Sequence, residues 1–268
     1  MAVIADMTVL ALNDAESSEN RIHSDSIATK YGFTGALVSG ANVFGYLSQP
    51  LIHEIGTIGL ECVEYRVNFR SPAYHNDQLL IKTASHNAEV DCEKYSSSAY
   101  NQRGDLLAEL ETLLRPDTPL KKVPYKAANE AAEFVRGEIH WDTIQLMEAA
   151  PDYLWTPREE DNRQRVQAQR DRSEFYQGPG AYIHPYYLLD ACNKALKRMF
   201  VLPAWIHTGS HLRIGKAIRC GQNIIIRSVP TDKWERNGHQ FIRLNIAMIV
   251  EEELALEVTH TAIFRIAM

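Results

Sequence analysis

The chain has 268 residues, of which 45% are hydrophobic and 23% charged, and its formal net charge is −6. This composition is typical of a soluble globular protein and excludes a disordered chain. The acidic balance argues against a nucleic-acid partner or an anionic membrane surface, because both attract basic faces.

No stretch reaches the roughly 20 consecutive apolar residues of a membrane-spanning helix. The apolar run in residues 1–12 lacks a basic region and is interrupted by Asp6, so it predicts a first β-strand rather than a signal peptide. The four scattered cysteines indicate buried thiols rather than a disulfide framework. We therefore expect a cytoplasmic protein.

The first half then predicts one buried helix followed by antiparallel strands. A glycine-rich turn leads into a helix over roughly 38–53, which is hydrophobic nearly all round and should be buried. Over 106–114, leucine and alanine alternate with Glu109 and Glu111, as in a strand with one buried face. Residues 101–104, Asn-Gln-Arg-Gly, predict a hairpin turn before this strand.

Residues 116–175 differ in composition, with several prolines and many charges. Short helices are predicted over Lys126–Gly137 and Trp141–Ala150, and a polar helix or loop over Pro157–Arg172. We interpret this segment as a connector that lies on the outside of the molecule.

The second half repeats the order of the first. A shift of 145 residues places Tyr31 on Tyr176 and Gly35 on Gly180, and it aligns a second apolar helix, roughly 185–200, with the first. In 241–250 apolar residues again alternate, and Glu251–Glu253 predicts the turn into the last strand.

One buried helix wrapped by a curved antiparallel sheet is the hotdog arrangement. The chain is therefore predicted to be an α+β double hotdog. Its parts are an N-terminal unit (1–115), the connector (116–175) and a C-terminal unit (176–268). Joining the two sheets edge to edge would form a pseudo-dimer within the chain and remove exposed edge strands. The sequence leaves open whether two such chains also form a homodimer.

The segment from Ser18 to Gly40 carries the chemical signal. It resembles the signature of MaoC-like (R)-specific enoyl-CoA hydratases, which reads Asp-x-Asn-Pro-x-His-x-Asp, then Ala, a Gly-Phe pair, and a His-Gly that starts the central helix. The matching residues are Asn20, His23, Asp25, Ala28, Gly32, Phe33 and Gly40. It is also similar to double-hotdog acyl-dehydratase relatives that read Asn-x-Ile-His-x-Asp.

Three positions depart from this pattern. Ser18 stands where the family has its catalytic aspartate, and a hydroxyl cannot serve as a carboxylate base. Arg21 replaces the proline, and Ser39 replaces the histidine before the helix glycine. The missing carboxylate could come from Glu19, Asp25 or Glu16.

The resemblance implies the reversible addition of water to a 2-enoyl thioester. That reaction needs a base for water, an acid for the α-carbon, and donors for the thioester oxygen, where enolate charge develops. We expect His23 to be the acid–base residue, with Glu19 or Asp25 as its carboxylate partner. The Gly40 N–H would stabilise the oxygen at the positive helix start, with Asn20 and Ser39 as further contacts to the substrate.

Ordinary structural roles compete with these assignments. His23 could be a solvated loop histidine, Asn20 a turn residue and Asp25 an N-cap. Gly40 could serve close contact between helix and sheet.

No metal or other cofactor is expected. His207 and His211 have the spacing of a helical zinc site, but Thr, Gly and Ser lie between them before a strand. The second half also lacks a counterpart of His23, because Ala168 aligns with it. Its site is therefore expected to be degenerate and to shape the acyl pocket.

The predicted activity is a hydro-lyase reaction on a small acyl thioester, at one pocket where the halves meet. A non-catalytic acyl-thioester binding protein remains the alternative, motivated by Ser18. A hotdog thioesterase, or a lyase or isomerase acting on another metabolite, remains a third. The thioesterase is disfavoured because 37–52 contains no carboxylate.

Overall fold

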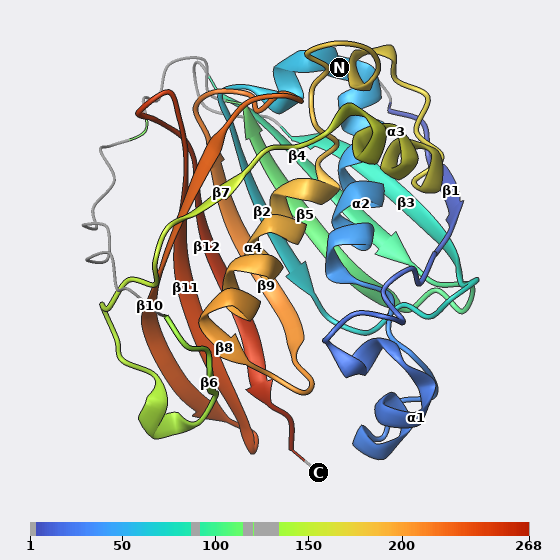
Figure 1. The fold of residues 1–268 in the computed structure, drawn as a ribbon. Coiled ribbons are helices and arrows are strands. Elements are labelled where there is room, and N and C mark those ends of the chain that lie inside the picture. The colour runs from blue at the N-terminus through green and yellow to red at the C-terminus, as the bar shows by residue number, and fades with distance from the viewer. Residues whose placement is uncertain (1–3, 87–91, 115–119, 121–133, 268) are drawn as a thin grey trace.

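One antiparallel sheet of ten strands dominates the computed structural model, which describes residues 4–86, 92–114, 120 and 134–267. Two long helices lie next to each other against one face of this sheet (Figure 1). The strand order is β1-β3-β4-β5-β2-β9-β12-β11-β10-β7, and β6 and β8 form a separate parallel pair.

The strands are β1 (Met7–Leu10), β2 (Val63–Phe69), β3 (Gln78–His86), β4 (Glu93–Tyr100), β5 (Leu106–Leu114), β6 (Gly137–Glu138), β7 (Tyr153–Trp155), β8 (Phe200–Val201), β9 (Ile206–Ile214), β10 (Ile224–Arg236), β11 (His239–Val250) and β12 (Glu253–Arg265). The helices are α1 (Asp25–Ala28), α2 (Gly40–Ile55), α3 (Glu159–Ala168) and α4 (Tyr186–Met199).

The strand order is the same in both halves when it is read outward from the middle. The series β2-β5-β4-β3-β1 corresponds to β9-β12-β11-β10-β7, and β2 pairs with β9 at the centre, from Val63 opposite Ile214 to Asn68 opposite Gly209. A Cβ on Gly209 would lie 2.9 Å from the carbonyl oxygen of Val67, so the close approach of the two strands requires glycine here. The predicted edge-to-edge join is therefore present.

The two central helices confirm the predicted helices to within about two residues at each end. Residues 41–52 of α2 are all buried, as predicted for a helix that is hydrophobic nearly all round. In α4 the last turns expose Lys194 and Arg198, and its buried side contacts α2 and the sheet. No helix in the described part of the chain is long and apolar enough to cross a membrane.

The strand predictions also hold. The even-numbered residues of β11 from Ile242 to Val250 are at most 1% exposed. Glu251 and Glu252 have positive φ angles and form the turn into β12. Between β4 and β5 the N–H of Gly104 donates to the carbonyl oxygen of Asn101 at 3.0 Å, which closes the predicted hairpin.

The connector differs from its prediction in two ways. The helix predicted over Trp141–Ala150 is wrong beyond a 3₁₀ turn at Trp141–Thr143. The N–H groups of Met147 and Ala150 donate to Pro230 and Ser228 at 2.8 and 3.1 Å, so the sheet takes the hydrogen bonds that a helix would have made. Most of Lys126–Gly137 lies outside the described residues, and its last residue begins β6.

In the rest of the connector, α3 forms within Pro157–Arg172, as predicted. The strand β7 was not predicted. It pairs with β10 and takes the edge position that β1 occupies in the first half.

Candidate functional site

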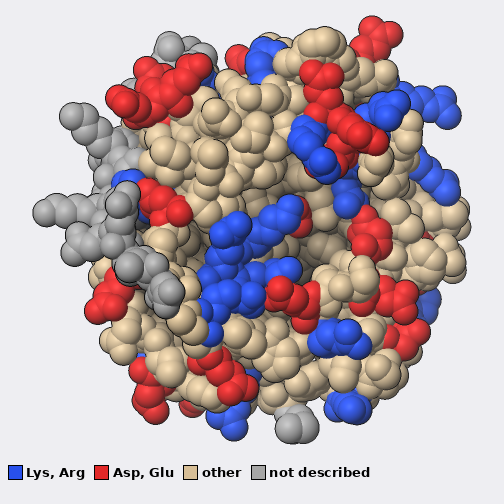
Figure 2. Space-filling model, viewed as in Figure 1, with Lys and Arg blue, Asp and Glu red and all other residues tan. Residues whose placement is uncertain are grey.

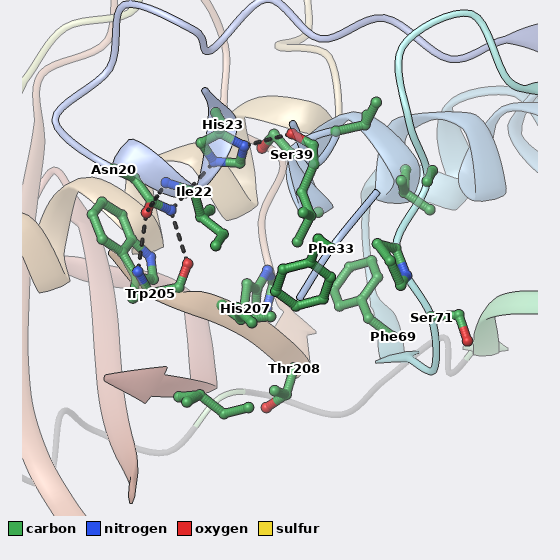
Figure 3. Close-up of a pocket in the computed structure, with 18 of the residues that line it drawn as sticks. Asn20, Ile22, His23, Phe33, Ser39, Phe69, Ser71, Trp205, His207 and Thr208 are labelled. Carbon is green, nitrogen blue, oxygen red and sulfur yellow. Dashed lines mark hydrogen bonds between the residues drawn. The ribbon is translucent and has the colours of Figure 1, made fainter. Parts of the chain in front are cut away.

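A cavity of about 370 Å³ lies at the start of α2, where the two halves meet. The first half contributes the loop around His23, the helix start at Gly40 and Phe69 from the end of β2. The second half contributes Trp205 and His207 at the start of β9, together with Asn193 from α4 and residues of β11 and β12. Most of the lining is apolar. Figure 3 shows the labelled side chains from both halves around this space.

His23 is held in one tautomer. Its Nδ1 lies 2.7 Å from the carbonyl oxygen of Leu37, which can only accept, so Nδ1 carries the proton. Its Nε2 therefore has the lone pair and lies 3.3 Å from the side-chain nitrogen of Asn20. Burial lowers the pKa of His23, although the Leu37 carbonyl and the charge of Asp14 raise it. His23 is thus a neutral imidazole near pH 7 with one nitrogen available for proton transfer.

Asn20 connects His23 to the second half. Its Nδ2 donates to the carbonyl oxygen of Trp205 at 3.0 Å, and its Oδ1 accepts from the Trp205 N–H at 3.0 Å (Figure 3). Its Oδ1 also accepts from the N–H of Ile22 and caps the 3₁₀ turn that carries His23. The turn role considered for Asn20 is present, and the same amide orients the histidine.

Gly40 is the first residue of α2 and presents an N–H with no acceptor within the described residues. The first N–H groups of a helix carry its positive partial charge and favour an anionic oxygen. A Cβ on Gly40 would lie 3.0 Å from Nδ1 of His207 and 3.1 Å from Cζ of Phe69, so the close helix–sheet contact considered for this glycine is also present. Ser39 caps the helix through its hydroxyl oxygen, which accepts from the Ala41 N–H at 3.3 Å, and it too lines the cavity.

Glu19 and Asp25 are not brought to the cavity. Glu19 is exposed and pairs with Arg136 at 2.9 Å; the hydrogen bond from Arg136 lowers the pKa of Glu19, and nearby Lys197 adds to this. Figure 2 shows Lys and Arg side chains gathered in a hollow on the face that carries α4 in Figure 1. A carboxylate held by such cations is a weaker base.

Asp25 is exposed at the first position of α1, and its Oδ1 accepts from the N–H of Ala36 at 2.7 Å. The N-cap position belongs to Ser24, so the capping role considered for Asp25 is wrong. Its carboxylate instead stabilises, through this hydrogen bond, the loop that leads to α2.

No aspartate or glutamate is among the described residues that line the cavity. Ser18, at the position of the family's aspartate, donates its hydroxyl to the Asn20 carbonyl at 3.2 Å. Asp14 is the carboxylate whose charge acts on His23, but it pairs with Arg165 and accepts from Asn42 at 2.8 Å. His23 therefore has no carboxylate partner among the described residues that line the cavity.

The second half lacks an equivalent centre. Pro185 aligns with Gly40 and has no N–H, so the start of α4 cannot donate at that position. His184 before it is buried and lies 3.5 Å from Oδ2 of Asp171. Asp171 in turn pairs with His53 at 2.9 Å, so these polar groups tie the end of α2 to the start of α4.

Sequence reasoning missed the residues that the second half contributes. His207 and His211 lie on a strand, and Nε2 of His211 pairs with Glu64 at 2.7 Å. Within the described residues no three His, Cys, Asp or Glu side chains gather as metal ligands. Nothing in the pattern around His207 or Asn193 indicated a cavity, because both reach it only through the contact between the halves.

Comparison with known proteins places the fold. No family model and no curated protein matches the chain. A solved structure named as a MaoC domain protein dehydratase, from Chloroflexus aurantiacus J-10-fl, is 12% identical, with a TM-score of 0.67, over 99% of this chain and 96% of its own. A Mycobacterium tuberculosis protein with a double hotdog fold is 10% identical, also with a TM-score of 0.67, over 98% of this chain and 96% of its own. This chain is a double hotdog protein.

A third structure, named as an oleoyl thioesterase from Lactobacillus plantarum, is 10% identical, with a TM-score of 0.56, over 97% of this chain and 96% of its own. The double hotdog fold is thus common to neighbours named as dehydratases and as thioesterases. The predicted resemblance to MaoC-like dehydratases is confirmed at the level of the fold, and the activity depends on the chemistry of the site.

Proposed function

We propose that this double hotdog protein adds water to 2-enoyl thioesters, or removes it from 3-hydroxyacyl thioesters, with His23 as the acid–base group. Two features that share one largely apolar cavity carry the proposal. One is a neutral histidine in a defined tautomer, and the other is a helix-start N–H that has no acceptor among the described residues. General acid–base catalysis and stabilisation of the thioester oxygen are the two demands of this reaction.

A single histidine can complete the reaction. Nε2 of His23 takes a proton from water while the water oxygen attacks the β-carbon, and the electrons of the double bond move through the α-carbon to the thioester oxygen. The Gly40 N–H stabilises the negative charge that develops there. The imidazolium then returns its proton to the α-carbon, so water has been added and His23 is again neutral. Dehydration is the reverse.

The environment of His23 suits both steps. Its lowered pKa keeps Nε2 unprotonated near neutral pH, so the base is present before reaction. The Leu37 carbonyl accepts from Nδ1 and stabilises the imidazolium that forms during the reaction. The 3.3 Å contact with Asn20 is long for a hydrogen bond, so a water molecule can compete for Nε2.

The test is hydration of a short and a medium 2-enoyl-CoA, followed by loss of enoyl absorbance, in wild type, His23→Ala and Glu19→Gln. We expect His23→Ala to lower kcat by about 10²–10⁴-fold. Glu19→Gln is the matched carboxylate control and should change kcat less than about twofold, because Glu19 pairs outside the cavity. Full activity in folded His23→Ala would refute the assignment. A comparable loss in Glu19→Gln would make Glu19 the missing carboxylate.

A non-catalytic acyl-thioester binding protein is the second candidate, and the absence of a carboxylate from the described cavity lining favours it. The same samples distinguish the two. Thermal stabilisation of wild type by both thioesters without turnover would establish binding alone.

A further inference from the structure

The second half places a histidine against the start of α2, on the strand that joins the halves. His207 is 9% exposed and lines the cavity, and its Nδ1 lies 3.0 Å from the position that a Cβ on Gly40 would occupy. This nitrogen is buried and has no hydrogen-bond partner within the described residues. An unpaired buried polar atom is unfavourable and rare in folded proteins, so its position beside Gly40 calls for a ligand or a structural reason.

Two neighbours determine which nitrogen of His207 carries the proton. The Ser210 hydroxyl lies 2.9 Å from Nε2 of His207 and 2.9 Å from Nδ1 of His260, and it can donate to only one of them. Nε2 of His260 is also buried without a partner. If Ser210 donated to His260, an unpaired N–H of His260 would be left in the closed core, where such groups are rare. If Ser210 donates to His207 instead, His260 keeps only an unpaired acceptor, its Nε2. The unpaired N–H is then that of Nδ1 of His207, which lies beside Gly40.

We infer that His207 is a further catalytic group, which donates Nδ1–H to the thioester oxygen together with the Gly40 N–H. The inference rests on the proposed binding of acyl thioesters at the start of α2. The ring of Phe69 covers the same point, with its Cζ 3.1 Å from the Gly40 Cβ position, so an entering ligand must displace this half-buried side chain. Contacts made during catalysis often tighten only when the ligand is bound.

The surroundings keep this donor neutral. Burial, followed by the adjacent His260 ring at 4.2 Å, holds the pKa of His207 well below its usual value. A neutral imidazole beside a helix start can polarise a carbonyl oxygen without adding a buried charge. His207 would thus supply a second donor at the oxygen in a site that has lost its carboxylate, and that donor comes from the half without a catalytic centre of its own.

The test combines kinetics with a measurement that needs no turnover. Two variants are compared with wild type: His207→Phe keeps a ring without nitrogen, and His207→Asn keeps an N–H near the Nδ1 position. Infrared spectra are recorded for bound butyryl-CoA labelled with carbon-13 at its carbonyl. This saturated thioester cannot be hydrated. Thermal melting checks that each variant is folded.

We expect wild type to lower the carbonyl stretching frequency of the bound thioester, His207→Phe to lose most of this shift, and His207→Asn to retain part of it. With 2-enoyl-CoA, His207→Phe should lower kcat by about 10²–10³-fold, with a smaller effect on KM. The spectroscopic result supports the inference even if wild type hydrates nothing, an outcome that would refute only the proposed activity. Equal carbonyl frequencies in wild type and folded His207→Phe would overturn the inference and leave that activity standing. Failure of wild type to bind butyryl-CoA would overturn both.

Discussion

The buried His260 should make the folded protein sensitive to acid. His260 is fully buried, and burial lowers its pKa from 6.5 to about 3. The unfolded chain binds this proton below pH 6.5 and the folded chain does not. The stability that depends on keeping His260 neutral is therefore present above pH 6.5 and is lost as the pH falls towards 3. One group with this shift reduces the free energy of unfolding by up to about 1.4 kcal/mol per pH unit, which integrates to about 2 kcal/mol between pH 6.5 and 4.5.

His260→Asn removes the titrating ring and keeps a polar group within reach of Ser210. The variant should be less stable than wild type at pH 7, because it loses the ring contact with His207. Its stability should nevertheless fall less steeply below pH 6.5. Urea unfolding at half-unit intervals from pH 7.5 to 4.5 gives both curves, and equal m-values would show that the two proteins unfold to the same extent.

The contributions of His23 and His184, whose pKa values are also lowered, cancel in the difference between the two curves, because both residues remain in both proteins. Replacing His260 also removes its contribution to the lowered pKa of His207, which flattens the curve of the variant in the same direction, so the difference reports the His260–His207 pair. We expect the stability gap between wild type and variant to close by about 2 kcal/mol from pH 6.5 to 4.5. Parallel curves would show that His260 takes up its proton equally in the folded and unfolded chains, and would refute the argument from burial.

Three further substitutions test the site and its support. Gly40→Ala should lower hydration more than tenfold, because its methyl group would meet His207 and Phe69 and cover the helix start; overpacking should cost about 1–3 kcal/mol in urea unfolding, and an unchanged rate would exclude this N–H from the reaction. Asn193→Leu should raise the melting temperature, because Oδ1 of Asn193 is buried without a partner among the described residues. A melting temperature below that of wild type would mean that Oδ1 is satisfied. Calorimetry of the same variant should show weaker butyryl-CoA binding. Asp171→Asn should cost about 1.5–3 kcal/mol in urea unfolding at pH 8, because it weakens the hydrogen bond to His53; no loss would show that this pair does not hold α2 and α4 together.

The local sequence was sufficient to predict the two central helices and several strands of the sheet, although not β7. Apolar residues recur at every second position of 242–250, and 41–52 are apolar nearly all round, so the side chains themselves specify a half-buried strand and a buried helix. The repeat also predicted that the two sheets join edge to edge, and the structure shows that β2 and β9 form this join. The His23 loop was recognisable because its residues lie close together along the chain.

Only the tertiary structure decided which residues contact each other across long separations in the sequence. Glu19 turns outward because Arg136, 117 residues away, pairs with it, and no local pattern encodes that choice. Residues 144–150 form no helix, and strand β10 instead accepts the N–H groups of Met147 and Ala150. His207 reaches the start of α2 through the contact between the halves, which also joins Asn20 to Trp205 across 185 residues. Periodicity and short motifs report the conformation of one segment, whereas the cavity depends on which distant segments the folded chain brings together.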